Sequence, residues 1–329
     1  MAGDILVYVE HDGPQPRHLA LETVSKAAEV TEAHGGQVIA AVLGGGADGT
    51  IERLGRFGAD TVYQDAGPVF DDYLTEPAVE YVAALIAETN PTAILLPYTQ
   101  DGKDIGSRLS ARLSAGAVAN VVNVLENNGR LDAIETVFGG NYSDTVEVER
   151  SPLAILLVRA NAFTAEEHPR QPAVKQMAFE PSEAAKRAQV GRRVQEEGTP
   201  TPIEEAQIIV SGGRGLGGPE PFGLLEELAG ELGGVVGASR AAVDAGWISY
   251  PHQVGQTGRT VKPQLYMAIG ISGAVQHRVG MQTADTIIAV NRDKDAPIFQ
   301  LADLAVVGDL FQIVPALTEE IKRRKGGAT

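Results

Sequence analysis

The sequence contains no cysteine among its 329 residues. This absence excludes disulfide bonds, thiolate nucleophiles and the iron–sulfur or zinc sites that depend on cysteine ligands. Aromatic residues make up only 5% of the chain, and no apolar run approaches the roughly 18 residues that a membrane-spanning helix requires. The N-terminal stretch MAGDILVYVEHDG places acidic Asp4 before a short apolar run, which is not typical of a signal peptide. We therefore expect a cytoplasmic protein.

Positively charged residues are also fewer than negatively charged ones. Lys and Arg number 27 against 43 Asp and Glu, which gives a formal net charge of −16. This balance argues against electrostatic binding of nucleic acid or anionic lipid by the chain as a whole. We expect the surplus acid on the outer surface, while a local basic pocket for an anionic ligand stays compatible with the total charge.

In the first half of the chain, short runs rich in Val, Ile and Leu alternate with stretches of helical spacing. The expected strands are Ile5–Val9, Val38–Leu43, Thr61–Tyr63 and Ala93–Leu96, and the expected helices are Arg17–Ala33, Ile51–Phe57, Glu76–Glu88 and Lys103–Leu113. This alternation predicts a mainly parallel sheet that is covered by helices on both faces.

Four further strands are expected before residue 160, at Val118–Leu125, Ala133–Phe138, Ser143–Glu149 and Leu153–Val158. Polar and apolar residues alternate in the segment TVEVE, which predicts a half-exposed antiparallel strand at the edge of the sheet.

The composition changes in a polar segment, residues 164–200, that is interrupted by four prolines. We expect this segment to be a connector and surface arm between an N-terminal domain at 1–163 and a second domain at 201–329. In the second domain the alternation resumes, with strands expected at Ala206–Val210, Leu265–Ile269 and Thr286–Val290 and helices at Phe222–Leu232 and from Val314 to about Arg324. The fold class is therefore α/β throughout.

The first motif that could carry chemistry is SGGRGLGGP, from Ser211 to Pro219, between an expected strand and an expected helix. Glycines let the backbone approach a ligand closely, and the N-terminus of the following helix suits a phosphate. Arg214 adds a cation. The spacing departs from the dinucleotide fingerprint, so this motif alone favours a nucleotide site and a simple tight turn about equally.

Two more glycine-bearing loops follow. In GASRAAVDAG, Ser239 is expected to cap a short helix, and Arg240 then lies in its first turn, where the helix dipole disfavours a cation. An anionic ligand or a surface carboxylate would each account for that arginine. In QVGQTGR, Gln256, Thr257 and the backbone amides offer several hydrogen-bond donors, although a polar turn would have the same composition.

The fourth motif is AIGISGAVQH, a strand followed by a glycine-rich loop and a helix. Ser272 is expected to cap that helix, and His277 to lie about a turn and a half inside it. Asn291 and Asp309 follow two further strand ends. Ligands of open α/β sheets bind at the carboxyl ends of the strands. Together, these loops predict one large nucleotide cofactor along the edge of the sheet.

Several motifs stand in a fixed order between Gly212 and Leu317: SRAAVDAG, QVGQTG, GISGA-QH, APIFQ-AD and GDLF. In this order they closely resemble the alpha subunit of electron transfer flavoprotein (ETF). The N-terminal half resembles the first domain of that family more loosely, through its strand–helix pattern and the segment TQDGKDIGSRLSARL. The resemblance implies two three-layer α/β domains: an N-terminal nucleotide-α-hydrolase-like domain that contacts the partner subunit, and a C-terminal Rossmann-like domain that binds FAD.

The resemblance also implies a function. The chain would form a heterodimer with an ETF beta subunit, and the heterodimer would carry electrons without turning over a substrate of its own. Its donors would be acyl-CoA dehydrogenases and other flavin dehydrogenases, and its acceptor a membrane ETF-quinone oxidoreductase. No nucleic acid is an expected partner. Carried over to matching positions, the FAD site comprises Arg214, Ser239, Arg240, Gln253, Val254, Gly255, Gln256, Thr257, Ser272, Gly273, Ala274, Val275, Gln276, His277, Asn291, Asp309 and Leu310.

Three of these residues have implied roles at the flavin ring. Arg240 would lie beside the isoalloxazine, the Thr257 hydroxyl would reach flavin N5, and His277 would lie near the C2 carbonyl. A guanidinium and an imidazole or imidazolium placed there would stabilise the negative charge that a reduced flavin gains.

Alternatives stay open. An NAD(P)- or FAD-dependent oxidoreductase with its own substrate would need a general acid or base beside the cofactor, for which only His277 is a candidate. A nucleotide-binding regulatory module is another reading. Within the ETF family, a bifurcating member would oxidise NADH with a second FAD in its beta subunit, and the alpha chain alone does not distinguish that case.

Overall fold

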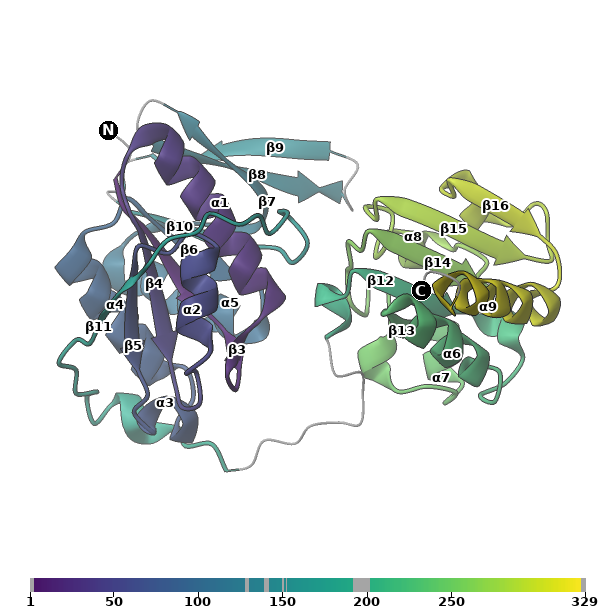
Figure 1. Cartoon of the computed structure of the whole chain (residues 1–329), viewed down its shortest axis with the longest axis horizontal. Coiled ribbons are helices and arrows are strands. Elements are labelled where there is room, and N and C mark those ends of the chain that lie inside the picture. The colour runs from purple at the N-terminus through teal and green to yellow at the C-terminus, as the bar shows by residue number, and fades with distance from the viewer. Residues whose placement is uncertain are drawn as a thin grey trace. The chain divides into compact units, whose positions relative to one another are not determined.

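The protein is described by a computed structural model, which covers residues 3–127, 130–138, 142–149, 151, 153–191 and 202–326 (Figure 1). The chain divides into two compact units, Met1–Val194 and Gln195–Thr329. Each unit is an α/β structure built on a largely or wholly parallel sheet, as the sequence predicts. Within the described ranges, no helix is both long enough and apolar enough to cross a membrane.

The first unit is built on a nine-stranded sheet with the order β11-β5-β4-β1-β6-β10-β7-β8-β9. Its strands are β1 (Ile5–Val9), β4 (Val38–Leu43), β5 (Thr61–Asp65), β6 (Ala93–Pro97), β7 (Gly116–Asn127), β8 (Arg130–Val137), β9 (Tyr142–Glu147), β10 (Ala154–Val158) and β11 (Ala173–Lys175). All neighbours pair in parallel except β8, which is antiparallel to both β7 and β9. The edge position of β9 confirms the expected antiparallel edge strand.

Helices cover both faces of this sheet, because its central strands are apolar on both sides. They are α1 (His18–His34), α2 (Thr50–Arg56), α3 (Val69–Asp72), α4 (Glu76–Thr89) and α5 (Gln100–Leu113), and a two-stranded sheet of β2 (His11–Asp12) and β3 (Gln15–Pro16) accompanies them. Leu19 of α1 and Leu54 of α2 belong to the core cluster on one face, and Val82 of α4 and Leu109 of α5 to the cluster on the other.

The polar segment that follows β10 returns to the first unit. Its strand β11 pairs with β5, with Ala173 opposite Thr61, and a short 3₁₀ turn follows at Ala185–Arg187. The rest of this segment, 192–200, lies outside the described residues.

The second unit has a five-stranded parallel sheet with the order β13-β12-β14-β15-β16. Its strands are β12 (Ile208–Gly212), β13 (Val235–Ala238), β14 (Leu265–Ile269), β15 (Thr286–Asn291) and β16 (Leu304–Val307). If the strands are numbered 1 to 5 along the chain from β12, their order in the sheet is 2-1-3-4-5, a doubly wound Rossmann-like arrangement. The chain first adds β13 on one side of β12 and then adds the remaining strands on the other side, so the switch point lies between β12 and β14. This switch point is where such sheets bind their ligands.

Two helices, α6 (Phe222–Leu232) and α9 (Leu310–Gly326), pack on one face of this sheet, with α7 (Arg240–Asp244) beside them. Short elements cover the other face, among them α8 (Val275–Arg278) and the 3₁₀ turn Pro297–Gln300. Asp309 caps α9 by accepting the Phe311 amide at Oδ1 (3.0 Å), so this helix begins before the expected Val314. The short strand β13 is not among the predicted strands, because it contains Gly237 and glycine is depleted in strands.

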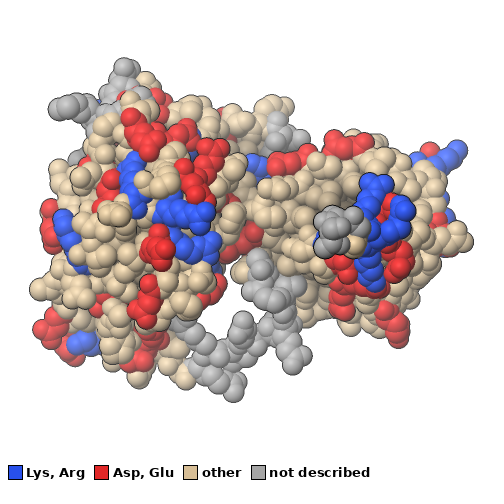
Figure 2. Space-filling view, in the orientation of Figure 1, with Lys and Arg blue, Asp and Glu red and all other residues tan. Residues whose placement is uncertain are grey.

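Charged residues are spread over the surface. On the face drawn in Figure 2, Asp and Glu side chains occupy many positions on both units, with Lys and Arg among them. The net charge of −16 is thus distributed over the exterior rather than gathered at one place on this face.

Candidate functional site

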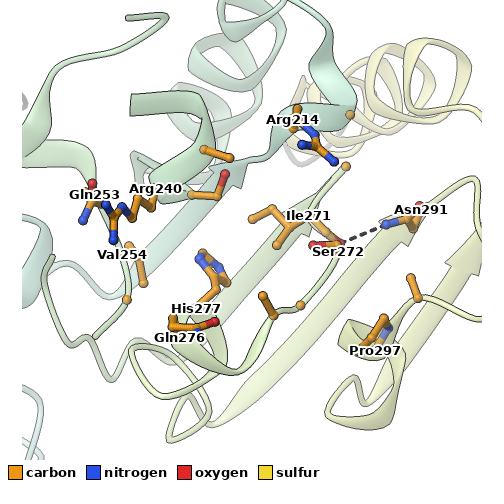
Figure 3. Close-up of a pocket in the computed structure, with 18 of the residues that line it drawn as sticks. Arg214, Arg240, Gln253, Val254, Ile271, Ser272, Gln276, His277, Asn291 and Pro297 are labelled. Atoms are coloured by element: carbon orange, nitrogen blue, oxygen red, sulfur yellow. Dashed lines mark hydrogen bonds between the residues drawn. The ribbon is translucent and has the colours of Figure 1, made fainter. Parts of the chain in front are cut away.

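A cavity of about 670 Å³ opens at the carboxyl ends of β12, β13, β14 and β15, around the switch point of the second sheet (Figure 3). Its lining consists of Arg214, Gly215, Ser239, Arg240, Ala241, Asp244, Gln253, Val254, Gly255, Gln256, Thr257, Gly270, Ile271, Ser272, Gly273, Ala274, Gln276, His277, Asn291, Asp293, Ala296 and Pro297. A volume of this size is typical of small-molecule and cofactor sites.

The structure brings together most of the residues that the sequence singled out. Every member of the expected set lines the cavity except Val275, Asp309 and Leu310. Val275 is exposed on α8, and Asp309 caps α9 while its other oxygen accepts from Arg292 (3.0 Å). Leu310 is the first residue of α9 and is buried in the core next to Gly270.

Sequence reasoning missed other lining residues. They are Gly215, Ala241, Asp244, Gly270, Ile271, Asp293, Ala296 and Pro297. A signal was present for several of them, since Asp244 follows Arg240 by one helical turn in SRAAVDAG and Ala296 and Pro297 begin the motif APIFQ.

The glycines of the first motif serve close backbone approach. Gly213 donates its amide to Ile269 O (2.9 Å) and Gly215 donates to Gly270 O (3.0 Å), so the loops after β12 and β14 are in direct backbone contact. A Cβ added at Gly213 would lie 2.3 Å from the carbonyl oxygen of Gly270. Of this motif, Arg214 and Gly215 line the cavity.

The expected phosphate site at the N-terminus of the following helix is not formed. Helix α6 begins only at Phe222, and its first amides are already bonded. Phe222 N donates to Pro219 O, and Gly223 N to Glu220 O. Neither the start of the helix nor the segment from Gly217 to Pro221 before it belongs to the cavity lining. The expectation fails because a 3₁₀ turn, Arg214–Leu216, separates the glycine loop from the helix.

Ser239 lies at the N-cap of α7, as predicted, but its side chain does not cap the helix. Its Oγ is buried and makes no hydrogen bond to any described residue. A buried hydroxyl without a partner is costly, so an unpartnered hydroxyl in the cavity wall points to a ligand that satisfies it.

Arg240 forms an ion pair within the cavity wall. Its Nε donates to Asp244 Oδ2 at 3.1 Å, and both side chains are well exposed, at 65% and 61%. The carboxylate that the sequence left open as a partner is therefore present, and it belongs to the same site. Figure 3 shows Arg240 and Arg214 at separate places around the cavity.

The loop from Gln253 to Thr257 is held from two sides. Val254 N donates to Ala238 O (2.9 Å) at the end of β13, and Gln256 N donates to Gln276 O (2.7 Å) in α8. Within the loop, Gln253 Nε2 donates to Thr257 Oγ1 (3.2 Å). Because the Thr257 hydroxyl accepts that bond, its own proton is free to be donated to a ligand.

We predict a measurable but moderate effect for Thr257→Ala. If FAD binds here with the Thr257 hydroxyl at N5, as the resemblance implies, the variant loses one neutral hydrogen bond, worth about 0.5–1.5 kcal/mol. FAD should then stay bound while its first reduction potential shifts by about 20–60 mV. Thr257→Ser keeps the hydroxyl and is the matched control. Potentiometric titration of the three proteins tests this, and identical potentials in Thr257→Ala and the parent would contradict it.

Glycines and an asparagine shape the loop after β14. Gly270 and Gly273 have φ values of 64° and 81°, in the left-handed region that favours glycine. Asn291 donates from Nδ2 to Ile271 O at 2.9 Å, the bond drawn in Figure 3, and so ties this loop to β15. The expectation that Ser272 caps the next helix is wrong, because the N-cap is Ala274 and the Ser272 carbonyl instead accepts from Ile298 N (3.1 Å).

His277 is the third residue of the four-residue helix α8, so it does not lie a turn and a half inside a helix. Its ring is buried, and its Nε2 lies 3.0 Å from the Tyr266 hydroxyl. Burial lowers the pKa of His277 to about 4, and the Val254 backbone offsets this only in part. The imidazole is therefore neutral at pH 7, and the imidazolium considered from the sequence is not supported.

The buried imidazole predicts acid sensitivity of the second unit when its cavity holds no ligand. The pKa of His277 is lower in the folded chain than its ordinary value of 6.5, so the unfolded chain binds more protons between about pH 4 and 6.5. Stability is then lost as the pH falls through this window. Between pH 7.5 and 5, the group costs about 2 kcal/mol of unfolding free energy.

The measurement compares the parent with His277→Gln by denaturant unfolding at the two pH values. Trp247 is the single tryptophan of the chain, so its fluorescence follows the second unit alone. Because the two proteins share all other titrating groups, the unfolding free energy of the parent should fall by about 2 kcal/mol more than that of the variant between pH 7.5 and 5. Equal losses would contradict the lowered pKa.

The donor chemistry of the cavity fits FAD. Two guanidiniums, the Thr257 hydroxyl and several side-chain amides belong to residues that line a space of suitable volume, and the Ser239 hydroxyl lies buried in its wall. FAD offers the complementary acceptors, a pyrophosphate and the ring carbonyls. Arg214 is exposed and makes no ion pair with any described residue, so it is available to an anionic group. Across the described ranges, no group of three His, Asp or Glu side chains could hold a metal ion.

Comparison with protein families decides the assignment. A family model described as "Electron transfer flavoprotein domain" matches residues 5–190, more than half of the chain, and one described as "Electron transfer flavoprotein FAD-binding domain" matches residues 202–282. The chain belongs to the electron transfer flavoprotein alpha-subunit family. The FAD-binding domain lies in the second unit and includes most of the cavity lining, so FAD is the cofactor, as the resemblance implied.

Whole-chain relatives agree with this ETF assignment. The chain is 39% identical over 325 residues to the electron transfer flavoprotein subunit alpha of Thermoanaerobacterium thermosaccharolyticum, covering 98% of each protein. It is 42% identical to that of Mycobacterium leprae and 43% identical to that of Mycobacterium tuberculosis, in each case over 98% of this chain and 99% of the relative. Proteins of the ETF family are electron carriers that function as heterodimers.

Proposed function

We propose that this chain is the alpha subunit of a heterodimeric ETF that holds FAD in the cavity of the second unit. The heterodimer accepts electrons from acyl-CoA dehydrogenases and related flavin dehydrogenases, and delivers them to a membrane ETF-quinone oxidoreductase. It works in the cytoplasm and turns over no substrate of its own. We propose that FAD contacts those residues of the expected set that line the cavity.

The observation that carries this proposal is the state of the titratable side chains in the cavity. Asp244 is paired with Arg240, Asp293 accepts the Asp295 amide at Oδ1 (3.0 Å), and His277 is neutral and bonded to Tyr266. An enzyme with its own substrate needs a positioned group that exchanges protons with it. These side chains are instead engaged with the protein, which favours electron transfer to and from the cofactor alone.

FAD, when bound, supplies the electron-accepting and electron-donating chemistry. The protein supplies binding, orientation and charge. Asp244 holds Arg240 at Nε, which leaves the outer nitrogens of the guanidinium as donors. A cation fixed in this way favours the added negative charge of a reduced cofactor, as preorganised donors do for any developing anion.

We also propose that residues 1–163 contact the beta subunit and that 164–200 act as the connector. Aromatic side chains at the β8–β9 end support a contact surface. Phe138 is 80% exposed and Tyr142 is 68% exposed, with their rings 5.9 Å apart in an edge-to-face contact. Exposed aromatic groups of this kind are typical of protein interfaces.

Co-expression with the beta subunit tests the function. The purified heterodimer should be yellow, and its flavin should be reduced by an acyl-CoA dehydrogenase with its substrate but not by NADH directly. A colourless heterodimer would overturn the proposed FAD site. Direct reduction by NADH, together with two FAD per heterodimer, would identify a bifurcating member instead. Fractionation of cells tests the cytoplasmic location.

A further inference from the structure

A line of three buried polar side chains runs beneath the cavity. The hydroxyl of Tyr266 in β14 lies 2.7 Å from Ser211 Oγ in β12 and 3.0 Å from His277 Nε2 in α8. Ser211 and Tyr266 are fully buried, and His277 is 7% exposed. Of the three, only His277 lines the cavity, so the two hydroxyls can influence a ligand only through the imidazole.

The hydroxyl of Tyr266 is not needed for packing. Its ring belongs to an apolar cluster with Ile209, Ala268 and Met281, where a phenylalanine ring would fill the same space. Burying a hydroxyl in such surroundings is costly unless its hydrogen bonds are satisfied. The bonds to Ser211 and His277 are therefore what the hydroxyl contributes to the structure.

The neighbouring strand leaves room for this arrangement. Gly237 in β13 is the register partner of Ser211, and a Cβ at Gly237 would lie 2.3 Å from Ser211 Oγ. Any larger residue there would displace the serine hydroxyl from its place beside Tyr266. The glycine in β13 thus leaves the space that Ser211 Oγ occupies beside Tyr266.

Which ring nitrogen of His277 carries the proton depends on this line of hydrogen-bonded side chains. A neutral imidazole carries one proton, on either Nδ1 or Nε2, and a hydroxyl that donates to one neighbour accepts from the other. The orientation of the Tyr266 hydroxyl between Ser211 and His277 thereby determines which nitrogen of the ring is the donor. Among the described residues, two contacts bear on the proton of the ring: the Tyr266 hydroxyl at Nε2 and the Val254 backbone. Of these two, the Tyr266 hydroxyl is the one that a side-chain substitution can remove.

We propose that Tyr266, held by Ser211, is a positioning residue of the FAD site that fixes the ring plane and the protonated nitrogen of His277. This inference rests on the proposed placement of His277 beside the flavin. Through the imidazole, the two hydroxyls adjust the hydrogen bond that the protein offers to the reduced cofactor.

Tyr266→Phe in the FAD-containing heterodimer is the test. The variant keeps the ring and removes the partner of Nε2, so we expect the binding preference for reduced over oxidised flavin to fall about tenfold. For one electron this corresponds to a first reduction potential about 59 mV lower. Ser211→Ala should shift the potential in the same direction. Tyr63→Phe, which removes a tyrosine hydroxyl in the first unit, should leave it unchanged.

Two further measurements separate positioning from a general structural effect. With ¹⁵N-labelled histidine, the His277 imidazole should show one tautomer in the parent and a mixture in Tyr266→Phe. In a double-mutant cycle, Tyr266→Phe should cause no additional shift in a His277→Gln background, because it acts through that ring. Trp247 fluorescence verifies that each variant is folded.

The outcomes are distinguishable. If His277→Gln keeps the parental potential, the placement of His277 beside the flavin is wrong, and the inference falls with it. If His277→Gln shifts the potential but Tyr266→Phe changes neither the potential nor the imidazole spectrum, only the role of Tyr266 is overturned. An equal shift from Tyr266→Phe in both histidine backgrounds would also overturn it.

Discussion

Gly213→Ala should yield a folded heterodimer that has lost most of its FAD. The added Cβ would lie 2.3 Å from Gly270 O and 2.7 Å from Ile271 Cα, both of which are backbone atoms. Gly213 itself has φ −111°, so an alanine is not strained there and the whole conflict falls on the loop after β14. That loop supplies Ile271 through Ala274 to the cavity wall.

The expected size follows from the cost of overpacking. Forcing one extra carbon into a close contact costs about 1–3 kcal/mol, which is about 5- to 150-fold in FAD affinity if the loop moves out of its binding position. This loss of affinity is measured by the flavin content after purification and by fluorescence titration of the apoprotein with FAD.

Gly223→Ala is the matched control. Gly223 lies in the first turn of α6, and a Cβ there meets nothing within 4 Å. This variant should retain FAD and should be slightly more stable, because alanine is a better helix former by up to about 1 kcal/mol. Full FAD occupancy in Gly213→Ala would mean that the contact between the two loops does not shape the site.

The framework of the cavity could be predicted from the sequence because its signals are local. Apolar runs such as Leu265–Ile269 and Thr286–Val290 indicate strands, and the glycine and polar residues after them indicate loops. In a parallel sheet these strand ends meet at one edge, so the loops were expected to be neighbours. In the structure, most of these loops line one cavity.

Contacts between distant segments could not be predicted in this way. The pairing of β11 with β5 and the backbone contact of Gly213 with Gly270 join parts of the chain that no local pattern relates. The same applies to the helix ends. Ser239 and Ser272 have the residue type of an N-cap, but neither caps a helix through its side chain.

The chemical state of the site residues also depends on the fold. A histidine near a ligand loop is compatible with either an imidazole or an imidazolium, and only burial beside Tyr266 makes the neutral form the stable one. Likewise, the sequence places Asp244 one helical turn after Arg240, but only the structure shows that the two side chains pair in the wall of the cavity. Burial and pairing are properties of the packed structure.

Arg240→Ala should lower the first reduction potential of the bound flavin more than any other single side-chain substitution considered above. The guanidinium lies in the cavity wall, held by Asp244 at Nε with its outer nitrogens free to donate. A hydrogen bond to a charged group is worth about 1.5–3 kcal/mol, or about 60–130 mV for one electron. The potential falls because the reduced cofactor loses a cation that the oxidised form needs less.

Three companion variants make the assignment specific. Arg240→Lys keeps the charge but loses the planar fork, so its potential should fall between those of the parent and Arg240→Ala. Asp244→Asn removes the opposing negative charge and should shift the potential upward. Arg259→Ala is the control, because Arg259 is paired with Glu204 at 2.9 Å and does not line the cavity. Opposite shifts for Arg240→Ala and Asp244→Asn would show that the ion pair acts through charge, whereas an unchanged potential in Arg240→Ala would remove this arginine from the flavin environment.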